Sequence, residues 1–196
     1  MSALLWKELT ELEEMIIGAN HPFCLLVGGD RIQTKLSIIK LLLPKVDKIV
    51  VGGLVACAFC RAQDHSKCAE IVTEEDVKLA EIVLKEATSL GIPLIISVDV
   101  LTLPKELLRQ VRSSKLKKIT MEHGILQLKQ TENQKSNFVS NHALADQATS
   151  FLQKHSLRDI PLGWIPIDIG SETVEVFCKE LRGSHTVLWT GIIISN

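Results

Sequence analysis

Two glycine pairs stand at the ends of short apolar runs, and each is followed by residues suited to a helix. The first is VGGDRIQTK, from Val27 to Lys35, and the second is VVGGLVACAF, from Val50 to Phe59. In an α/β sheet, ligands bind beyond the carboxyl ends of the strands. Glycines there let a phosphate approach the backbone, and the next helix offers free N–H groups. One such turn alone is a weak signal, but two make an anion site at this edge a hypothesis worth following.

Three cysteines and a histidine, which begin inside the second of these segments, have the spacing of a metal site. Cys57, Cys60, His65 and Cys68 follow the pattern C-x2-C-x4-H-x2-C, and these residue types bind zinc tetrahedrally. The first two cysteines, however, fall on a predicted helix that packs against a sheet. Buried cysteine behaves there as a small hydrophobe. We therefore expect a packing role and regard zinc as the less favoured alternative.

A basic segment lies between residues 105 and 118. It holds six lysines and arginines against one acid, Glu106, so its formal charge is +5. Such a segment can contact phosphate backbones or an acidic protein surface. It has no interleaved aromatic residues, so base stacking is not supported. We expect a solvated basic helix face and no nucleic-acid partner.

The elements that position these residues follow from apolar periodicity and from residues that begin or end helices. Thr73 with three acids directly after it is typical of a helix N-terminus, and Gly91 suits the end of the same helix. Pro44 ends an earlier helix. The predicted helices are 3–18, 31–43, 54–62, 73–90 and 171–182, with Ser171 as the cap of the last. The predicted strands are 22–27, 48–51, 93–98 and 185–194.

This alternation predicts the class of fold. Apolar strands joined by helices are typical of a parallel sheet covered by helices on both faces. We therefore expect an α/β domain of three layers, αβα, with a mostly parallel sheet. Residues 104–155 interrupt the pattern as a divergent insert, in which 129–141 predict a polar loop and 143–155 a short helix.

The composition excludes some classes of function. The 196 residues fit one domain or a domain with a large insertion, and 46% hydrophobic against 4% aromatic residues predict an aliphatic core. A net charge of −1 gives no global field that would recruit nucleic acid or an anionic membrane. The sequence shows no secretory signal and no membrane-spanning run. We expect a cytoplasmic protein whose five cysteines stay reduced.

Five motifs, in order along the chain, resemble the nucleotide-binding half of the phosphoglycerate kinases. PFCLLVGGDRIQTK is similar to a family segment with Gly-Gly-Ala-Lys, and KVDKIVVGGLVACAF to one with Gly-Gly-Gly-Met-Ala-Phe. PLIISVDV, IPLGWIPIDIGSET and VLWTGIII are similar to the motifs Pro-Val-Asp, Gly-Trp and Trp-Asn-Gly-Pro. The opening LLWKELTELEEM resembles the helix that joins the family's two domains. The resemblance thus implies a linking helix at 1–20 and the Rossmann-like C-terminal domain at 21–196.

What the resemblance implies for function is a site for ADP or ATP with Mg. The family passes a phosphoryl group between 1,3-bisphosphoglycerate and Mg-ADP, which depends mostly on positioning and charge neutralisation. Of two family lysines, one is retained and the other is an arginine, which is not an equivalent cation. The resemblance makes six residues the candidate nucleotide-binding set: Gly28, Gly29, Arg31, Lys35, Gly52 and Gly53.

Several positions depart from the family pattern. Asp30 stands where the family has alanine, and a carboxylate there opposes anion binding unless it pairs with Arg31 or Lys35. Leu54 replaces the third glycine of the second turn and is expected to fill part of the base slot. Thr190 replaces the asparagine of the last motif.

Two further positions bear on catalysis. Pro166 and Ile167 replace a Gly-Leu pair, which removes a backbone donor. Asp99 and Asp168 lie at ends of predicted strands, where functional acids are common, but they match family positions better explained by structure. We therefore assign no catalytic residue and no metal ligand.

Whole segments of the family pattern also have no match. The chain starts at the linking helix and stops at Asn196, before the family's Gly-Gly-Gly-Asp-Thr segment, so the triose-binding domain and a transition-state helix are expected to be absent. The resemblance therefore implies an inactive kinase-like protein, serving as an interaction or scaffold module with at most weak ADP or ATP binding. Two alternatives stay open: a nucleotide-binding protein, and a phosphoglycerate kinase completed by a partner chain.

The end of the chain suggests a partner. If the sheet is truncated at its C-terminal edge, the last strand, with the apolar run at 192–194, is left uncovered. An uncovered apolar edge favours pairing with another chain. We therefore expect a protein partner or self-association at this edge, and no membrane partner.

Overall fold

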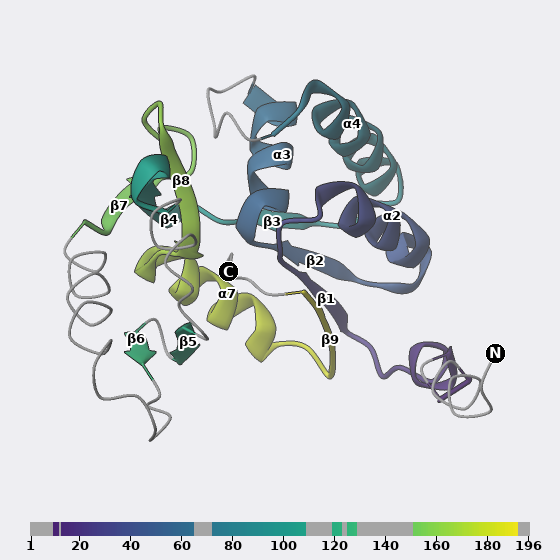
Figure 1. The fold of residues 1–196 in the computed structure, drawn as a ribbon. Coiled ribbons are helices and arrows are strands. Elements are labelled where there is room, and N and C mark those ends of the chain that lie inside the picture. Colours follow the sequence, from purple (N-terminus) through teal and green to yellow (C-terminus); the bar gives the residue numbers. More distant parts are fainter. Residues whose placement is uncertain are drawn as a thin grey trace.

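A four-stranded parallel sheet lies at the centre of the protein. The structure is a computed structural model that describes residues 10–11, 13–64, 72–108, 119–122, 125–128 and 151–191. The strands are β1 (Phe23–Val27), β2 (Lys48–Val51), β3 (Leu94–Ile96) and β9 (Thr186–Thr190), in the order β3-β2-β1-β9 (Figure 1). All five residues of β1 are buried, as expected for an inner strand covered on both faces.

Helices cover the two faces of this sheet. On one face lie α2 (Ile32–Leu42), α3 (Gly53–Asp64) and α4 (Glu74–Ser89), and on the other lies α7 (Ser171–Arg182) (Figure 1). The side chains of β1 divide accordingly. Phe23 and Leu25 belong to the large core under the three helices, whereas Leu26 packs with Phe177 of α7. The three-layer α/β architecture predicted from the sequence is therefore confirmed.

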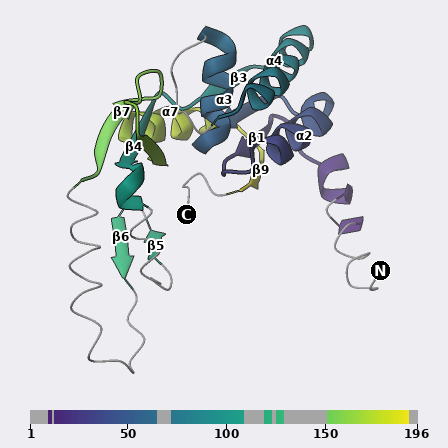
Figure 2. The same ribbon diagram turned by 45° about the horizontal axis from the view of Figure 1, so that its top comes forward.

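A second, antiparallel sheet adjoins the first. Its central strand β4 (Asp99–Pro104) pairs with β7 (Gln153–Ser156) and with β8 (Trp164–Ile169). A separate hairpin of β5 (Ile119–Glu122) and β6 (Ile125–Leu128) lies away from the central sheet (Figure 2). The insert expected at 104–155 thus contributes strands, and both its flanks belong to the second sheet.

Three predicted elements are corrected by the structure. The strand expected at 93–98 is limited to Leu94–Ile96, after which Asp99 begins a new strand instead of ending this one. The helix expected at 143–155 is wrong for its last residues, which form β7. The last strand ends at Thr190, because Gly191 turns the backbone with a φ of 82°. Residues 192–194 lie outside the described part of the chain.

The helix ends are set by specific contacts. At α4 the predicted cap is confirmed as a capping box, in which Thr73 Oγ1 accepts from the Asp76 amide and the Asp76 side chain accepts from the Thr73 amide. At α7 the expectation is wrong, because Ser171 is already the first helical residue. The Asp99 carboxylate of β4 accepts instead from the Glu172 and Thr173 amides, at 3.2 and 2.7 Å. A strand of the second sheet therefore caps a helix of the first.

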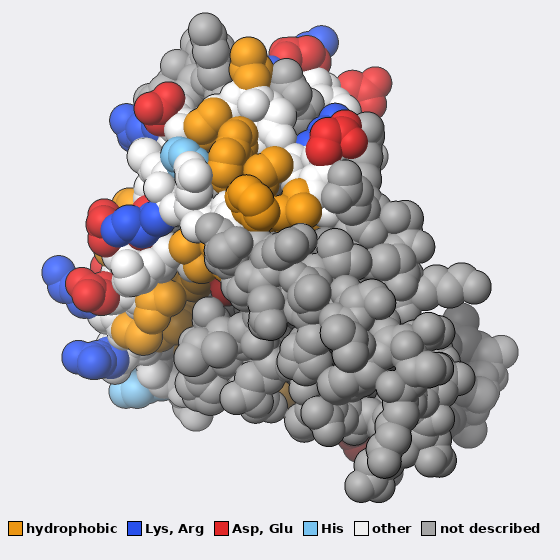
Figure 3. Space-filling view, turned by 60° about the vertical axis from the view of Figure 1, so that its left-hand side comes forward, with side chains coloured by type: hydrophobic (Ala, Val, Ile, Leu, Met, Phe, Trp, Pro, Cys, Tyr) orange, Lys and Arg blue, Asp and Glu red, His pale blue; other side chains and the backbone are white. Residues whose placement is uncertain are grey.

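The surface carries apolar side chains on the side of the second sheet. They gather there between acidic and basic groups (Figure 3). Leu162, in the turn before β8, is 75% exposed, and Phe151, just before β7, is 50% exposed. Of the helices in the described part of the chain, none combines the length and apolarity needed to cross a bilayer.

Candidate functional site

The two glycine turns meet at the carboxyl edge of the parallel sheet. Gly28 and Gly29 follow β1, and Gly52 and Gly53 come directly after β2. Since these parallel strands are neighbours, the two turns lie side by side. Gly29 and Gly53 have φ values of 108° and 62°, a left-handed region that glycine reaches without strain.

Two of the glycine N–H groups are used inside the protein. The Gly28 amide donates to the Thr190 carbonyl at 3.0 Å, and the Gly52 amide donates to the Val27 carbonyl at 2.8 Å. These bonds join β1 to its two neighbouring strands beyond their ends. The turns therefore supply room for a ligand near the backbone, but these two amides are not available as donors to it.

Lys35 is a cation at this edge of the sheet. It lies in the first turn of α2, is half-buried, and its Nζ donates to Thr190 Oγ1 on β9 at 2.9 Å. Within the described residues, no carboxylate lies within ion-pair distance of the Lys35 ammonium. The site thus holds a partly desolvated positive charge that no described acidic side chain neutralises.

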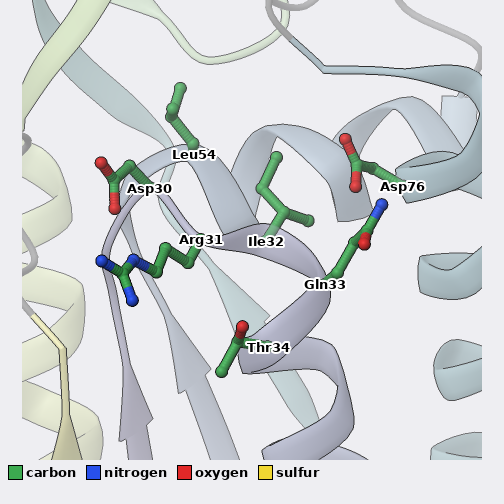
Figure 4. A pocket seen from close by; sticks show the side chains of 7 residues that line it. All are labelled: Asp30, Arg31, Ile32, Gln33, Thr34, Leu54 and Asp76. Atoms are coloured by element: carbon green, nitrogen blue, oxygen red, sulfur yellow. The ribbon is translucent and has the colours of Figure 1, made fainter.

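Arg31 and Asp30 lie at the start of α2 and are exposed. Arg31 occupies the N-cap position without a side-chain hydrogen bond to the helix. Neither residue forms an ion pair with a described group, so Asp30 is not paired with Arg31 or Lys35. Both side chains extend to the same side of the α2 N-terminus (Figure 4). The Asp30 carboxylate would not oppose anion binding if it paired with Arg31 or Lys35. Since it pairs with neither, its negative charge opposes an anion at this turn.

A depression of about 410 Å³ lies over the first turn of α2. Ile32 and Leu54, each 6% exposed, give it apolar surface, and Asp76 of α4 borders it (Figure 4). The N-terminal turns of α2, α3 and α4 thus surround one hollow. Leu54, which the sequence comparison placed at a base slot, lines this hollow. The lining residues are Asp30, Arg31, Ile32, Gln33, Thr34, Leu54 and Asp76.

The other two candidate sites from the sequence lie partly outside the described residues. Cys57 and Cys60 lie on α3 and are fully buried in the core, whereas His65 and Cys68 lie outside the described residues. Among the residues that the structure describes, no three His, Cys, Asp or Glu side chains are grouped to hold a metal ion. Most of the basic segment, 109–118, also lies outside the described part.

Two of the buried aspartates, Asp99 and Asp168, have opposite environments. Burial raises the pKa of Asp168, which accepts a hydrogen bond only from the next residue's amide among the interactions described. Burial also opposes the charge of Asp99, but hydrogen bonds from Thr173 and Glu172 and the nearby Lys154 outweigh it and lower the pKa of Asp99. The Asp99 carboxylate thus caps the N-terminus of α7.

Sequence reasoning noted Thr190 only as a replacement and did not connect it with Lys35. The two residues are 155 positions apart, and only the pairing of β1 with β9 brings them together. The Trp189 indole N–H donates to the Gly191 carbonyl at 2.8 Å and helps fix the turn after Thr190. The signal available in the sequence was a threonine directly before a glycine, inside the strand predicted at 185–194.

Comparison with known proteins gives one consistent family. A family profile described as Phosphoglycerate kinase matches residues 1–127. Phosphoglycerate kinases of Moorella thermoacetica and Pelotomaculum thermopropionicum are 27% and 28% identical over 188 residues, which is 96% of this chain and 38% of each relative. The structure of phosphoglycerate kinase from Coxiella burnetii matches 98% of this chain and 39% of that one, with a TM-score of 0.66 and 19% identity. The chain thus spans about two fifths of these relatives' length.

Proposed function

Since the chain belongs to the phosphoglycerate kinase family, we propose that it is a kinase-like module that binds ADP or ATP weakly and does not transfer a phosphoryl group on its own. The nucleotide's phosphates lie at the edge formed by Gly28, Gly29, Gly52 and Gly53, with Lys35 as the main cation and Arg31 as the second. The module serves as an interaction or scaffold unit whose ligand is a nucleotide.

The observation that carries this proposal is the environment of Lys35. A half-buried ammonium with no described carboxylate nearby is stabilised by an anion, because burying an unpaired charge is costly. Its position at the carboxyl edge of a parallel sheet is the place where such folds bind ligands. A phosphate chain supplies the missing negative charge.

Two residues make the binding weak. The unpaired carboxylate of Asp30 repels a phosphate chain brought to the neighbouring turn. The buried side chain of Leu54 occupies the start of α3, where a glycine would leave the backbone open to a base. Both effects reduce affinity without removing the cation that favours binding.

Among the described residues, two backbone donors at this edge are not free for transfer. Phosphoryl transfer depends on several positioned donors acting together. Here the Gly28 and Gly52 amides are used inside the protein. The magnesium of the proposed ligand enters with the nucleotide.

Calorimetric titration with Mg-ADP and Mg-ATP tests the proposal. We expect dissociation constants in the range of about 0.1 to 1 mM, and loss of measurable binding in Lys35→Ala. Lys40→Ala removes the same charge from an exposed position of the same helix and should bind like the unchanged protein. Tight binding that survives Lys35→Ala, or no binding in either protein, would contradict the proposal.

A second candidate is phosphoglycerate kinase activity completed by another polypeptide. It is favoured by the 38% share of each curated relative that this chain spans. A coupled assay for 3-phosphoglycerate-dependent ATP consumption distinguishes the two functions. Turnover by this chain alone sinks the first proposal, and turnover only after addition of a triose-binding domain supports the second.

The edge strand β9 suggests how the module associates. β9 ends the parallel sheet on one side, and none of its residues is charged. Val187 and Trp189 are 44% and 62% exposed. Because charged residues are the usual protection of an edge strand, we propose that this edge pairs with a second copy of the chain.

A further inference from the structure

The chain enters the parallel sheet through three residues, His21, Pro22 and Phe23, which are held from both sides. On the β2 side, Asp47 Oδ2 accepts from the Phe23 amide, and the Asp47 amide donates to the Phe23 carbonyl at 2.9 Å. On the β9 side, the His185 amide donates to the Pro22 carbonyl at 2.9 Å, and His185 Nδ1 donates to the His21 carbonyl at 2.6 Å. We call these five residues the β1 entry.

The side chain of His21 gives the β1 entry a group that changes its charge near neutral pH. His21 Nδ1 lies 2.6 Å from Asp47 Oδ2, and the two side chains are 61% and 44% exposed. The carboxylate oxygen that accepts from the Phe23 amide therefore also binds the His21 ring. We propose that His21 and Asp47 form a pH-sensitive clamp, which holds the β1 entry more firmly when the His21 ring is protonated. This clamp lies at the amino end of the sheet and does not depend on nucleotide binding.

The carboxylate of Asp47 is ionised throughout the range in which histidine changes its charge. The hydrogen bonds from the Phe23 amide and from His21 lower the pKa of Asp47. An unperturbed histidine titrates near about pH 6.5. Protonation of His21 therefore converts a hydrogen bond from a neutral ring into a hydrogen-bonded ion pair, which is stronger. The ion pair is present between about pH 4 and about pH 6, is lost above this window as His21 loses its proton, and is lost below it as Asp47 gains one.

Two other titratable side chains, Lys48 of β2 and His185 before β9, act on the β1 entry. The charge of Lys48 contributes to the lowered pKa of Asp47, and its ammonium is held by the carbonyl and the carboxylate of Glu180, at 2.8 and 3.5 Å. A lysine is charged throughout this pH range, so it adds no pH dependence there. The His21 carbonyl can only accept, so His185 Nδ1 carries a hydrogen in either charge state, and a proton added at Nε2 leaves that bond in place.

The clamp bears on the helix that precedes the sheet. Residues 13–17 are helical, and this short purple helix lies beyond the amino end of β1 (Figure 1). Ile16 and Ala19 pack against the large core, whereas Met15 and Ile17 are 65% and 70% exposed. The direction in which the helix leaves the domain thus depends on the β1 entry. A firmer entry limits the movement of this helix relative to the sheet.

Amide hydrogen exchange followed by NMR tests the inference. The Phe23 amide reports on the clamp, because it donates to the same carboxylate as His21. The Ile49 amide donates to the Pro93 carbonyl and reports on the sheet away from the clamp. Protection factors remove the intrinsic pH dependence of exchange. We expect the protection of Phe23, relative to Ile49, to be about threefold higher at about pH 5.5 than at about pH 8.

Four variants assign this effect to His21. His21→Arg carries its charge at both pH values and should protect Phe23 equally at both, whereas His21→Gln keeps a donor without charge and should give the lower protection at both. His185→Gln should keep the pH dependence. His155→Gln is the matched control, since it removes a histidine that bonds to Thr102 in the second sheet, and it should keep the pH dependence too.

Three results would overturn the clamp. The first is equal relative protection of Phe23 at both pH values in the unchanged protein. The second is a pH dependence that persists in His21→Gln, which would place the sensing group elsewhere. The third is its loss in His185→Gln, which would make His185 the sensor instead of His21.

Discussion

At the scale of single residues, the edge of the parallel sheet holds two opposed charges. Lys35 lies half-buried with a threonine hydroxyl as its described partner, and Asp30 stands exposed at the start of the same helix without a described counter-ion. The sequence alone shows both residues but not whether they neutralise each other. In the structure the two side chains form no ion pair, so neither charge neutralises the other.

Replacing Asp30 by alanine should therefore raise nucleotide affinity. The gain is expected to be about fivefold, or about 1 kcal/mol, and to shrink in high salt because the charge is exposed. Calorimetry with Mg-ADP at low and high ionic strength measures it. Asp159→Ala removes an exposed charge after β7 and serves as the control. Unchanged affinity in Asp30→Ala would show that the phosphates bind elsewhere.

Asp168 gives a prediction about pH. Its pKa is raised in the folded protein by burial, so folding favours the protonated form. The stability that this proton contributes is present below the unfolded-state pKa and is lost as the pH rises through the folded-state pKa. Asp168→Asn should thus raise the melting temperature at pH 7 by about 2–4 °C and have little effect near pH 3. A larger gain at pH 3 than at pH 7 would contradict this account.

At the scale of elements, the start of α7 joins the two sheets. The Asp99 carboxylate of β4 accepts from Thr173 Oγ1 at 2.6 Å as well as from two amides of the helix. Gly170, at the N-cap position, leaves room for it, since a Cβ there would lie 2.1 Å from Asp99 Oδ2. The contact between the Asp99 carboxylate of β4 and the first turn of α7 therefore requires glycine at position 170.

Gly170→Ala should destabilise the protein by about 2 kcal/mol, because the new methyl displaces the capping carboxylate. Gly183→Ala at the other end of α7 is the matched control, since its Cβ would meet no atom within 4 Å. Thermal unfolding followed by circular dichroism should show a loss of about 4–8 °C for the first variant and almost none for the second. Equal losses of melting temperature in the two variants would mean that the displaced Asp99 carboxylate is not the cause of the destabilisation.

The elements also show how far the sequence can be interpreted. The parallel strands and their helices were predictable, because local signals such as the Thr73 capping box and Gly91 at φ 71° mark their limits. The antiparallel sheet was not. Its strand β7 reads Gln-Lys-His-Ser without apolar alternation, and β8 contains Pro166. These strands are stabilised by their pairing with β4, and no pattern in the local sequence indicates that pairing.

The same division holds for the candidate site. The glycine turns and Lys35 could be found from their order along the chain. The Lys35–Thr190 contact could not, because it depends on β9 lying next to β1. The internal use of the Gly28 and Gly52 amides is likewise a property of the assembled edge, and a sequence motif cannot show which donors remain available.

At the scale of the whole molecule, the parallel sheet has a neutral and partly exposed edge at β9. Pairing of two such edges would extend the sheet across two copies. The second sheet carries exposed apolar residues of its own, such as Leu162. Two separate surfaces are therefore suited to a contact between copies: the β9 edge, and the apolar side chains near the second sheet.

Val187→Lys places a charge in the middle of β9 and should abolish self-association through that edge. Sedimentation velocity over a range of protein concentrations measures it, with the unchanged chain expected to shift from monomer to dimer. Leu162→Lys adds the same charge to an exposed apolar position of the second sheet and should leave the dimer intact. Monomers at every concentration in the unchanged chain would remove the basis for the β9 contact.

The turn after Thr190 has a practical consequence for optical work. Trp189 is 62% exposed, and its indole N–H donates to the Gly191 carbonyl next to Thr190, the hydrogen-bond partner of Lys35. An indole in this position changes its emission when a nearby ligand alters its hydration. With Trp6 and Trp164 replaced by phenylalanine, the protein keeps a single native fluorophore, and stopped-flow mixing can then follow the arrival and departure of nucleotide without any attached dye.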